Sequence, residues 1–144
     1  DEATALRREL VTKQPWHLHW HEELVRRLAA RGEMDAAEKW LRDELARDIE
    51  RNEWEADTLR GYLCDHFRAR GQWDRWLKFT EEWIATNPES QSWSSANAQH
   101  LSALVYNDRL EDAYKKVEQW LTEVRTPEKL TPPQLARFES ALYF

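Results

Sequence analysis

The residues best suited to chemistry lie close together near the start of the chain, at positions 17–23 (HLHWHEE). On a helix, His17 and His21 lie one turn apart, and two imidazoles at that spacing can share a zinc ion. A zinc site needs further ligands, but Glu22 and Glu23 point away from the histidine pair, and the H-E-x-x-H pattern of zinc enzymes is absent. We therefore predict no metal site and interpret the histidines as polar residues on the solvated face of a helix.

The single cysteine and the paired carboxylates are also poor candidates for catalysis. Cys64 and His66 are two residues apart, so a helix places them on different faces, and Cys64 falls in an apolar stripe where a thiol packs as a small core residue. Neighbouring carboxylates, as at positions 22–23 and 81–82, point apart on a helix and remain in solvent. Three glycines scarcely supply a phosphate-binding loop, and no G-x-S-x-G sequence occurs. We expect no catalytic residues and no cofactor, and hence no enzyme.

The composition favours a folded, soluble domain whose partners are proteins. The chain has 144 residues, a net charge of -6, 33% charged residues, 12% aromatic residues and nine tryptophans. A chain of this length buries a core of its own, and the aromatic content argues against disorder. The negative charge argues against nucleic acids and anionic membranes as partners, and no apolar run approaches a membrane span of about 18 residues. The lone cysteine leaves the compartment open but suits a reducing one such as the cytoplasm.

Three segments of the chain repeat one pattern, with apolar residues at helical spacing on both sides of a short break. These segments are 24–41, 63–80 and 100–117. Gly32, Gly71 and Asp108 stand at the break; Gly71 follows Gly32 by 39 residues, and Asp108 follows Gly71 by 37. Each segment therefore predicts two helices joined by a tight turn.

Local signals support these turns. Gly32 and Gly71 can adopt the left-handed conformation that ends a helix. Asp35 and Asp108, each followed three residues later by a glutamate, predict capping boxes that open the next helix. We expect helices near 2–13, 16–31, 35–50, 54–70, 73–86, 92–106, 109–125 and 133–144.

These helices are expected to form a single all-α domain over residues 1–144. A partial repeat at 1–15 precedes three hairpins at about 16–50, 54–88 and 92–126, and a terminal helix follows at 133–144. Because the chain begins and ends inside apparent helices, we expect it to be a fragment of a longer repeat protein.

The repeat resembles that of the tetratricopeptide (TPR) family over essentially the whole chain. The family has glycine at the turn, an aromatic or apolar residue two positions later, alanine three beyond that and proline at the exit. The matching residues are Gly32, Met34, Ala37 and Leu41, then Gly71, Trp73 and Pro88, then Asp108, Leu110, Ala113 and Val117. Trp76 departs from the pattern at the alanine position, and the spacing exceeds the family's period of about 34 residues. A fainter similarity, to the half-a-TPR repeats of RNA-processing factors, rests on Trp76, Phe79 and Glu82.

The resemblance implies a right-handed superhelical stack of antiparallel helical hairpins, a TPR-like α-solenoid. In this family the first helix of each hairpin lines a concave face that binds an extended peptide or a partner's helix. The matching positions here are His19, Glu22, Arg26, Thr58, Asp65, Arg68, Ser95, Ser102 and Tyr106. Most of these side chains are polar, which indicates a polar, hydrogen-bonded peptide as partner. The implied function is a protein–protein interaction scaffold.

Two other functions stay open, an architectural spacer within a longer array and self-association through the ends of the stack. The tryptophans bear on this choice. Most of them are expected to pack in the core, namely Trp40, Trp73, Trp76, Trp83 and Trp120. Four fall at the starts of first helices, where exposed rings would anchor a partner. These are Trp16, Trp20, Trp54 and Trp93.

Overall fold

The computed structural model describes residues 2–15, 17–47, 52–86, 93–124 and 131, and within them the chain is helical and contains no strand. The helices are α1 (Glu2–Lys13), α2 (Leu18–Ala30), α3 (Met34–Ala46), α4 (Glu53–Ala69), α5 (Trp73–Thr86), α6 (Trp93–Tyr106) and α7 (Leu110–Val124). They lie close to the predicted positions, which confirms the all-α class, whereas the helix expected at 133–144 lies outside the described residues. No helix in this part of the chain is long and apolar enough to cross a membrane.

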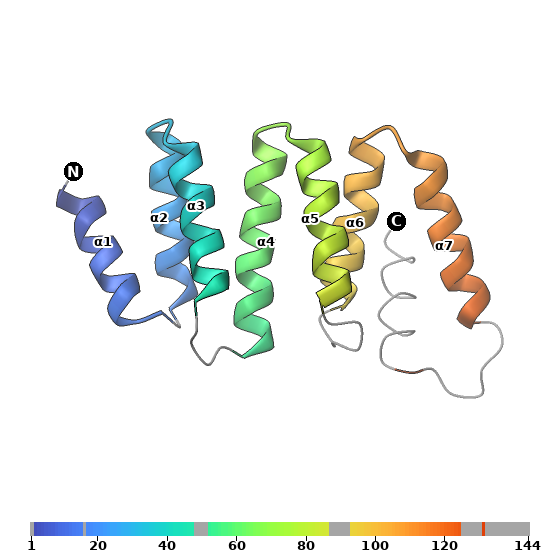
Figure 1. The fold of residues 1–144 in the computed structure, drawn as a ribbon, viewed down its shortest axis with the longest axis horizontal. Coiled ribbons are helices and arrows are strands. Elements are labelled where there is room, and N and C mark those ends of the chain that lie inside the picture. The colour runs from blue at the N-terminus through green and yellow to red at the C-terminus, as the bar shows by residue number, and fades with distance from the viewer. Residues whose placement is uncertain (1, 16, 48–51, 87–92, 125–130, 132–144) are drawn as a thin grey trace. The chain divides into compact units, whose positions relative to one another are not determined.

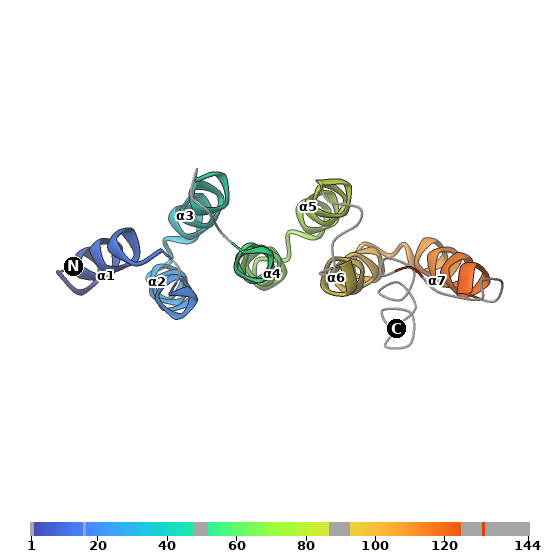
Figure 2. The same ribbon diagram turned by 90° about the horizontal axis from the view of Figure 1, so that it is seen from below.

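The chain divides into two compact units, residues 1–66 and 67–144, and α4 runs across the boundary between them. In the first unit, α2 packs against α1 and against α3 (Figure 1). In the second unit, α6 packs against α5 and against α7 (Figure 2). The successive helices α2 and α3 run antiparallel on either side of a tight turn, as the repeat pattern predicts.

The same backbone turn closes a helix at three places. At Gly32, Gly71 and Asp108, the backbone N–H donates to the carbonyl three residues earlier, and the next N–H donates to the carbonyl five residues before it. All three residues have a left-handed backbone, with φ angles of 77°, 63° and 57°. This is the arrangement that satisfies the last carbonyls of a helix while reversing the chain. The alignment of these three residues in the sequence is thereby confirmed.

The two predicted capping boxes are wrong. Helix α3 is preceded by Glu33, whose side chain makes no capping hydrogen bond, and Asp35 lies inside the first turn. Asp108 closes α6 in the left-handed conformation, and the carbonyl of Arg109 accepts the first amide bonds of α7. A capping residue needs an extended backbone, so Asp108 cannot end one helix in this way and also cap the next.

The core of the first unit includes a cluster between α2 and α3. Leu24 and Leu28, one turn apart on α2, are fully buried together with Ala37 of α3. The half-buried ring of Trp40 packs against this cluster. Burial of each leucine stabilises the hairpin by roughly 1.5–3 kcal/mol. The small side chain of Ala37 leaves room for the leucines at this crossing.

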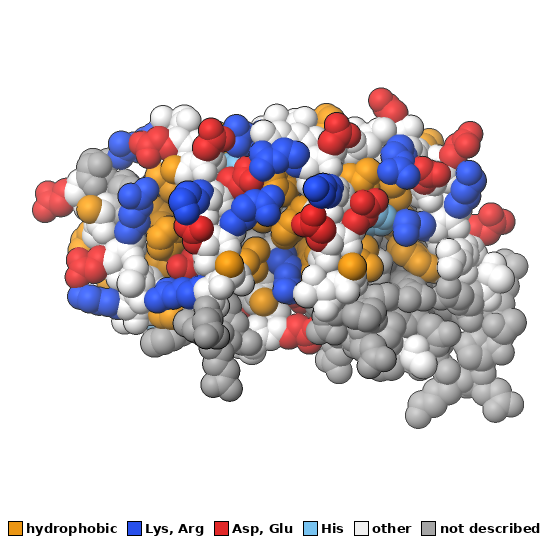
Figure 3. Space-filling view, viewed as in Figure 1, with side chains coloured by type: hydrophobic (Ala, Val, Ile, Leu, Met, Phe, Trp, Pro, Cys, Tyr) orange, Lys and Arg blue, Asp and Glu red, His pale blue; other side chains and the backbone are white. Residues whose placement is uncertain are grey.

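Large aromatic residues dominate the core of the second unit. Phe67 and Trp76 are fully buried, and Trp83 and Trp120 are nearly so, which confirms the prediction that these tryptophans pack in the interior. Phe67 meets Phe79 edge to face, with ring centroids 5.9 Å apart. Outside the cores, basic and acidic side chains are interspersed over the face shown in Figure 3, as amphipathic helices require.

The left-handed turns lead to a prediction about stability. Gly32→Ala and Gly71→Ala should each lower the free energy of unfolding by about 1–2 kcal/mol, because alanine would have to adopt a positive φ. Gly61→Ala is the matched control: Gly61 lies inside α4, an added Cβ meets nothing within 4 Å, and stability should rise by about 0.5–1 kcal/mol. Urea unfolding followed by circular dichroism measures all three variants. Equal effects at the three positions would contradict the argument.

Candidate binding surface

Two aromatic side chains stack where α5 begins and α6 ends. Trp73 is the first residue of α5, two positions after the turn at Gly71, and Tyr106 is the last residue of α6, two positions before the turn at Asp108. Their ring centroids lie 4.8 Å apart and the ring planes are inclined by 26°. Tyr106 nevertheless exposes 52% of its surface, and Trp73 is half-buried. The pair is therefore accessible to a partner.

Trp76 connects this pair to the core of the second unit. Its ring centroid lies 6.3 Å from that of Trp73 and 5.7 Å from that of Tyr106. The side chain of Trp76 is fully buried. An exposed pair that rests on a buried ring loses little conformational freedom when a partner binds, because packing already restricts its rotamers.

A hollow of about 360 Å3, which we call the turn hollow, opens at this aromatic pair. It lies between the α4–α5 turn and the α6–α7 turn, both in the second unit. Its lining residues are Gly71, Gln72, Trp73, Asp74, Arg75, Tyr106, Asn107 and Asp108. The combination of two aromatic rings with short polar side chains is typical of a surface that recognises another protein.

The charged side chains that line the turn hollow differ in whether they have a binding partner within the chain. Arg75 donates a hydrogen bond to Gln72 Oε1 (3.0 Å), and its guanidinium carbon lies 5.1 Å from the centre of the Phe67 ring. Asp74 and Asp108, in contrast, form no ion pair with any residue that the structure describes. Both aspartates are exposed. The hollow thus presents two carboxylates beside its aromatic pair.

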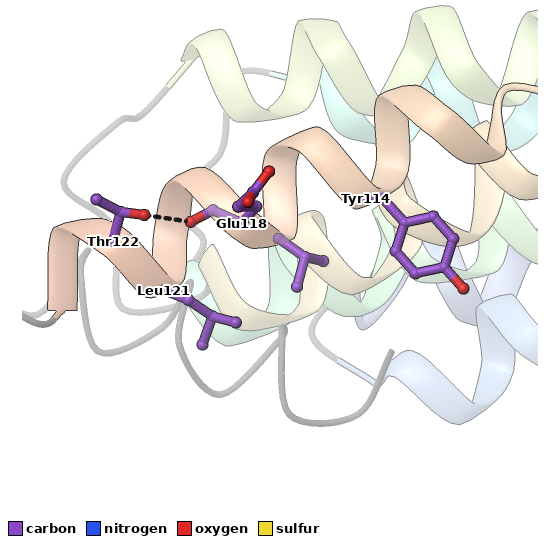
Figure 4. Close-up of a pocket in the computed structure, with 5 residues that line it drawn as sticks. Tyr114, Glu118, Leu121 and Thr122 are labelled. Atoms are coloured by element: carbon purple, nitrogen blue, oxygen red, sulfur yellow. Dashed lines mark hydrogen bonds between the residues drawn. The ribbon is translucent and has the colours of Figure 1, made fainter.

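A second apolar surface follows α7. Leu110, Tyr114, Val117 and Leu121 recur at spacings of four, three and four residues, which places them on one face of the helix. Leu110 exposes 46% and Tyr114 exposes 60% of their surface. Tyr114, Val117 and Leu121 line a hollow of about 420 Å3 together with Glu118 and Thr122, whose hydroxyl donates to the Glu118 carbonyl (2.8 Å; Figure 4). We call these four residues the α7 stripe.

Three of the predicted groove residues lie on α2. His19, Glu22 and Arg26 are all exposed. His19 Nδ1 lies 4.0 Å from a carboxylate oxygen of Glu22, and the guanidinium of Arg26 binds the carboxylate of Glu23. On α4, Asp65 is exposed, and the Thr58 hydroxyl donates to the backbone carbonyl of Trp54 (2.8 Å).

Tyr62, which the sequence did not single out, lies close to two of these groove residues. Burial raises the pKa of Tyr62, and the negative charge of Glu22, a hydrogen bond to Glu22 and the charge of Asp65 raise it further. The structure thus brings Glu22 of α2 and Asp65 of α4 to the same tyrosine within the first unit. The sequence predicted Glu22 and Asp65 as groove residues of two different repeats. It did not predict that they lie near the same side chain, which depends on how α2 and α4 are folded together.

The remaining groove residues belong to the second unit. Arg68 and Ser95 are exposed, and the Ser102 hydroxyl donates to the Ala98 carbonyl of its own helix (2.9 Å). Tyr106 lines the turn hollow. Its partner Trp73 had been assigned to core packing; the sequence signal for the site was that both aromatic residues stand two positions from a left-handed turn.

The tryptophans at the starts of first helices differ in exposure. Trp54 exposes 71% of its surface, whereas Trp20 is half-buried. Trp16 and the side chain of Trp93 lie outside the described residues. Trp54 therefore meets the condition, exposure, under which a tryptophan of this group could anchor a partner, and it adds an aromatic side chain to the surface of the first unit.

Glu23 is buried, which corrects the prediction that the neighbouring glutamates remain in solvent. Its side chain accepts hydrogen bonds from Arg26, from Arg27 (3.0 Å) and from Arg7 of α1 (3.3 Å). The bonds from Arg26 and Arg27 hold the pKa of Glu23 below its usual value. This carboxylate therefore ties α1 to α2 and is not available for general acid–base chemistry.

His21 is also fully buried, so the interpretation of this histidine as a solvated residue was wrong. Its Nε2 lies 3.0 Å from the carbonyl oxygen of Pro15, and its Nδ1 accepts a hydrogen bond from Trp40 Nε1 (3.3 Å). A carbonyl only accepts and an indole N–H only donates, so the ring is neutral with its proton on Nε2. Neither nitrogen is open to a metal, and the described residues contain no group of three potential ligands.

His100 is a second buried histidine, in the second unit. Its Nδ1 shares a hydrogen bond with the hydroxyl of Thr80 (3.1 Å), which is itself fully buried. Burial, assisted by the positive charges of Lys116 and Arg109, lowers the pKa of His100 from 6.5 to about 4. Cys64 is buried as predicted and packs in the core.

Comparison with known proteins adds no further information about this surface. The chain matches no protein-family model, no curated protein and no solved structure.

The low pKa of His100 predicts a loss of stability in mild acid. The unfolded chain binds a proton at this histidine as the pH falls through about 6.5, whereas the folded chain does so only near 4. Between pH 7 and pH 4.5 this difference should cost on the order of 2 kcal/mol of unfolding free energy. His100→Gln removes the titration and should reduce the pH dependence by that amount in urea unfolding at both pH values. An unchanged dependence in this variant would contradict the prediction.

Proposed function

We propose that this chain is a protein-interaction module that binds a peptide or helix of a partner protein. The observation that carries the proposal is the stacked, accessible pair of Trp73 and Tyr106 at the turn hollow. Tryptophan and tyrosine dominate the energetics of protein interfaces because each buries a large area with few rotatable bonds. The pair is also held in place by Trp76, so little ordering is required on binding.

The repeat pattern supports the same function. In a TPR-like α-solenoid, a right-handed superhelical stack of hairpins presents the first helix of each hairpin to a bound peptide. Glu22, Tyr62 and Asp65 would then form a polar part of that face in the first unit, where they already lie close together. The acidic composition favours a protein partner over nucleic acid, and the buried Cys64 suits a reducing compartment such as the cytoplasm.

The α7 stripe favours a second candidate function, self-association. Hairpin repeats bury their apolar faces by stacking on a neighbour, and the exposed parts of Leu110 and Tyr114 offer such a face. A second copy of the chain that packs on this stripe would cover it. An architectural spacer is the third reading, and it requires no exposed aromatic pair.

The first candidate predicts that peptides bind through the aromatic pair. Peptides selected from a random displayed library on the full chain should lose at least about tenfold in affinity on Tyr106→Ser or Trp73→Ser, because either change removes an anchor ring. Leu6→Ser on α1 is the control, since it removes an exposed apolar side chain outside both candidate surfaces, and it should leave affinity within about twofold. Isothermal titration calorimetry measures the three variants. Peptides that bind all variants equally would refute the proposed role of the pair.

The second candidate predicts a mass above the 17.3 kDa of one chain that rises with protein concentration. Leu121→Glu should return the mass to that of one chain, because a charge in the α7 stripe would have to be buried in the contact. Lys115→Glu changes an exposed charge on the same helix and should not alter the mass. Static light scattering decides the question, and a constant mass of 17.3 kDa at all concentrations would exclude self-association.

A further inference from the structure

We infer that the turn hollow recognises a cationic side chain, arginine or lysine, of the partner peptide. The inference rests on the proposed function, because it names the chemistry that the Trp73–Tyr106 pair would bind. Three features of the hollow point to a cation: its aromatic faces, its carboxylates and the engagement of its own basic residues.

The aromatic faces supply the first argument. The face of an indole or phenol ring carries the negative part of the ring quadrupole and attracts an ammonium or guanidinium group. Trp73 and Tyr106 stack with centroids 4.8 Å apart and remain partly exposed, whereas Trp76, 5.7 Å from Tyr106, is fully buried and supports the pair from below. The chain already uses this interaction beside the hollow, where the Arg75 guanidinium lies over the Phe67 ring at 5.1 Å.

The carboxylates supply the second argument. Asp74, the second residue of α5, and Asp108, at the α6–α7 turn, both line the hollow, and in the sequence each lies within two residues of one ring of the aromatic pair. Neither has an ion-pair partner within the described part of the chain. A cation that stacks on the rings gains charge-assisted hydrogen bonds from these groups, whereas an anion would be repelled by both.

The basic residues near the hollow are engaged elsewhere, which is the third argument. Arg75 is held by Gln72 Oε1 (3.0 Å) and by the Phe67 ring. Arg109, next to Asp108, donates a hydrogen bond to Asp112 (2.8 Å). Because both guanidinium groups have partners of their own, the carboxylates of Asp74 and Asp108 are left to an incoming cation. An apolar side chain would fit less well, since Gln72 and Asn107 contribute polar groups to the lining.

The experiment compares three peptides of equal length in which serine alternates with arginine, glutamate or leucine. Binding to the full, isotope-labelled chain is followed by the indole N–H signals in NMR, with the Trp73 signal identified from Trp73→Phe. We expect the arginine peptide to shift the Trp73 signal, and its dissociation constant to rise with salt. The glutamate and leucine peptides should bind at least about tenfold more weakly.

Two double variants with the same net charge test the carboxylates. D74N/D108N should weaken the arginine peptide at least about tenfold, because asparagine keeps the size of the side chain and tolerates the left-handed backbone at position 108. E81Q/E82Q removes two exposed charges of α5 that do not line the hollow and should change the affinity by less than about twofold. Unchanged NMR signals of the buried tryptophans confirm that each variant is folded. If D74N destabilises α5, the single variant D108N replaces the double variant in this test.

The outcomes separate this inference from the proposed function. Stronger binding of the glutamate or leucine peptide at Trp73, or an arginine peptide that binds D74N/D108N as well as the natural chain, overturns the cationic specificity and leaves a peptide-binding hollow. If none of the three peptides moves the Trp73 signal, the cationic specificity is overturned. The proposed function itself fails only if selected peptides also bind independently of Tyr106 and Trp73.

Discussion

The left-handed turn that closes a helix at Gly32, Gly71 and Asp108 is the constraint on which the rest of the structure depends. A helix ends with carbonyl groups that have no partner, and the two returning N–H bonds at each turn satisfy them while the chain reverses within a few residues. The reversal brings the last residues of one helix and the first residues of the next to the same end of a hairpin. The aromatic pair of the turn hollow arises from this geometry, because Trp73 follows one such turn and Tyr106 precedes another.

Asp108 shows that the geometry matters more than the residue type. Two of the turns use glycine, which adopts a positive φ without steric cost, whereas the third uses aspartate at a φ of 57°. Aspartate tolerates this region better than most residues. At the turn hollow it also adds a carboxylate that glycine could not provide. The left-handed turn residue therefore reverses the chain at all three places. At Asp108 its side chain also lines the candidate site.

Buried polar side chains connect the helices in both units. Glu23 binds arginines of α1 and α2, and the His21 ring links Pro15 to Trp40 of α3. In the second unit, Thr80 and His100 join α5 to α6. Each of these groups would be costly to bury without its partner, so the helices are stable only in the register that completes the bonds. These contacts complement the leucine and tryptophan cores, which are less selective about register.

The sequence by itself determined the all-α class, the approximate helix bounds, the equivalence of the three turns and the burial of Cys64, Trp76, Trp83 and Trp120. These properties follow from local periodicity and from turn chemistry, which act over a few residues. Tyr106 is exposed, as a groove residue would be, and its role in binding stays a prediction. Tertiary structure alone decided that His21 and Glu23 are buried, that Tyr62 lies near Glu22 and Asp65, and that Trp73 stacks on Tyr106. Each of these depends on a contact between residues far apart in the chain, such as His21 with Trp40, and helical spacing carries no information about which distant side chain will meet another.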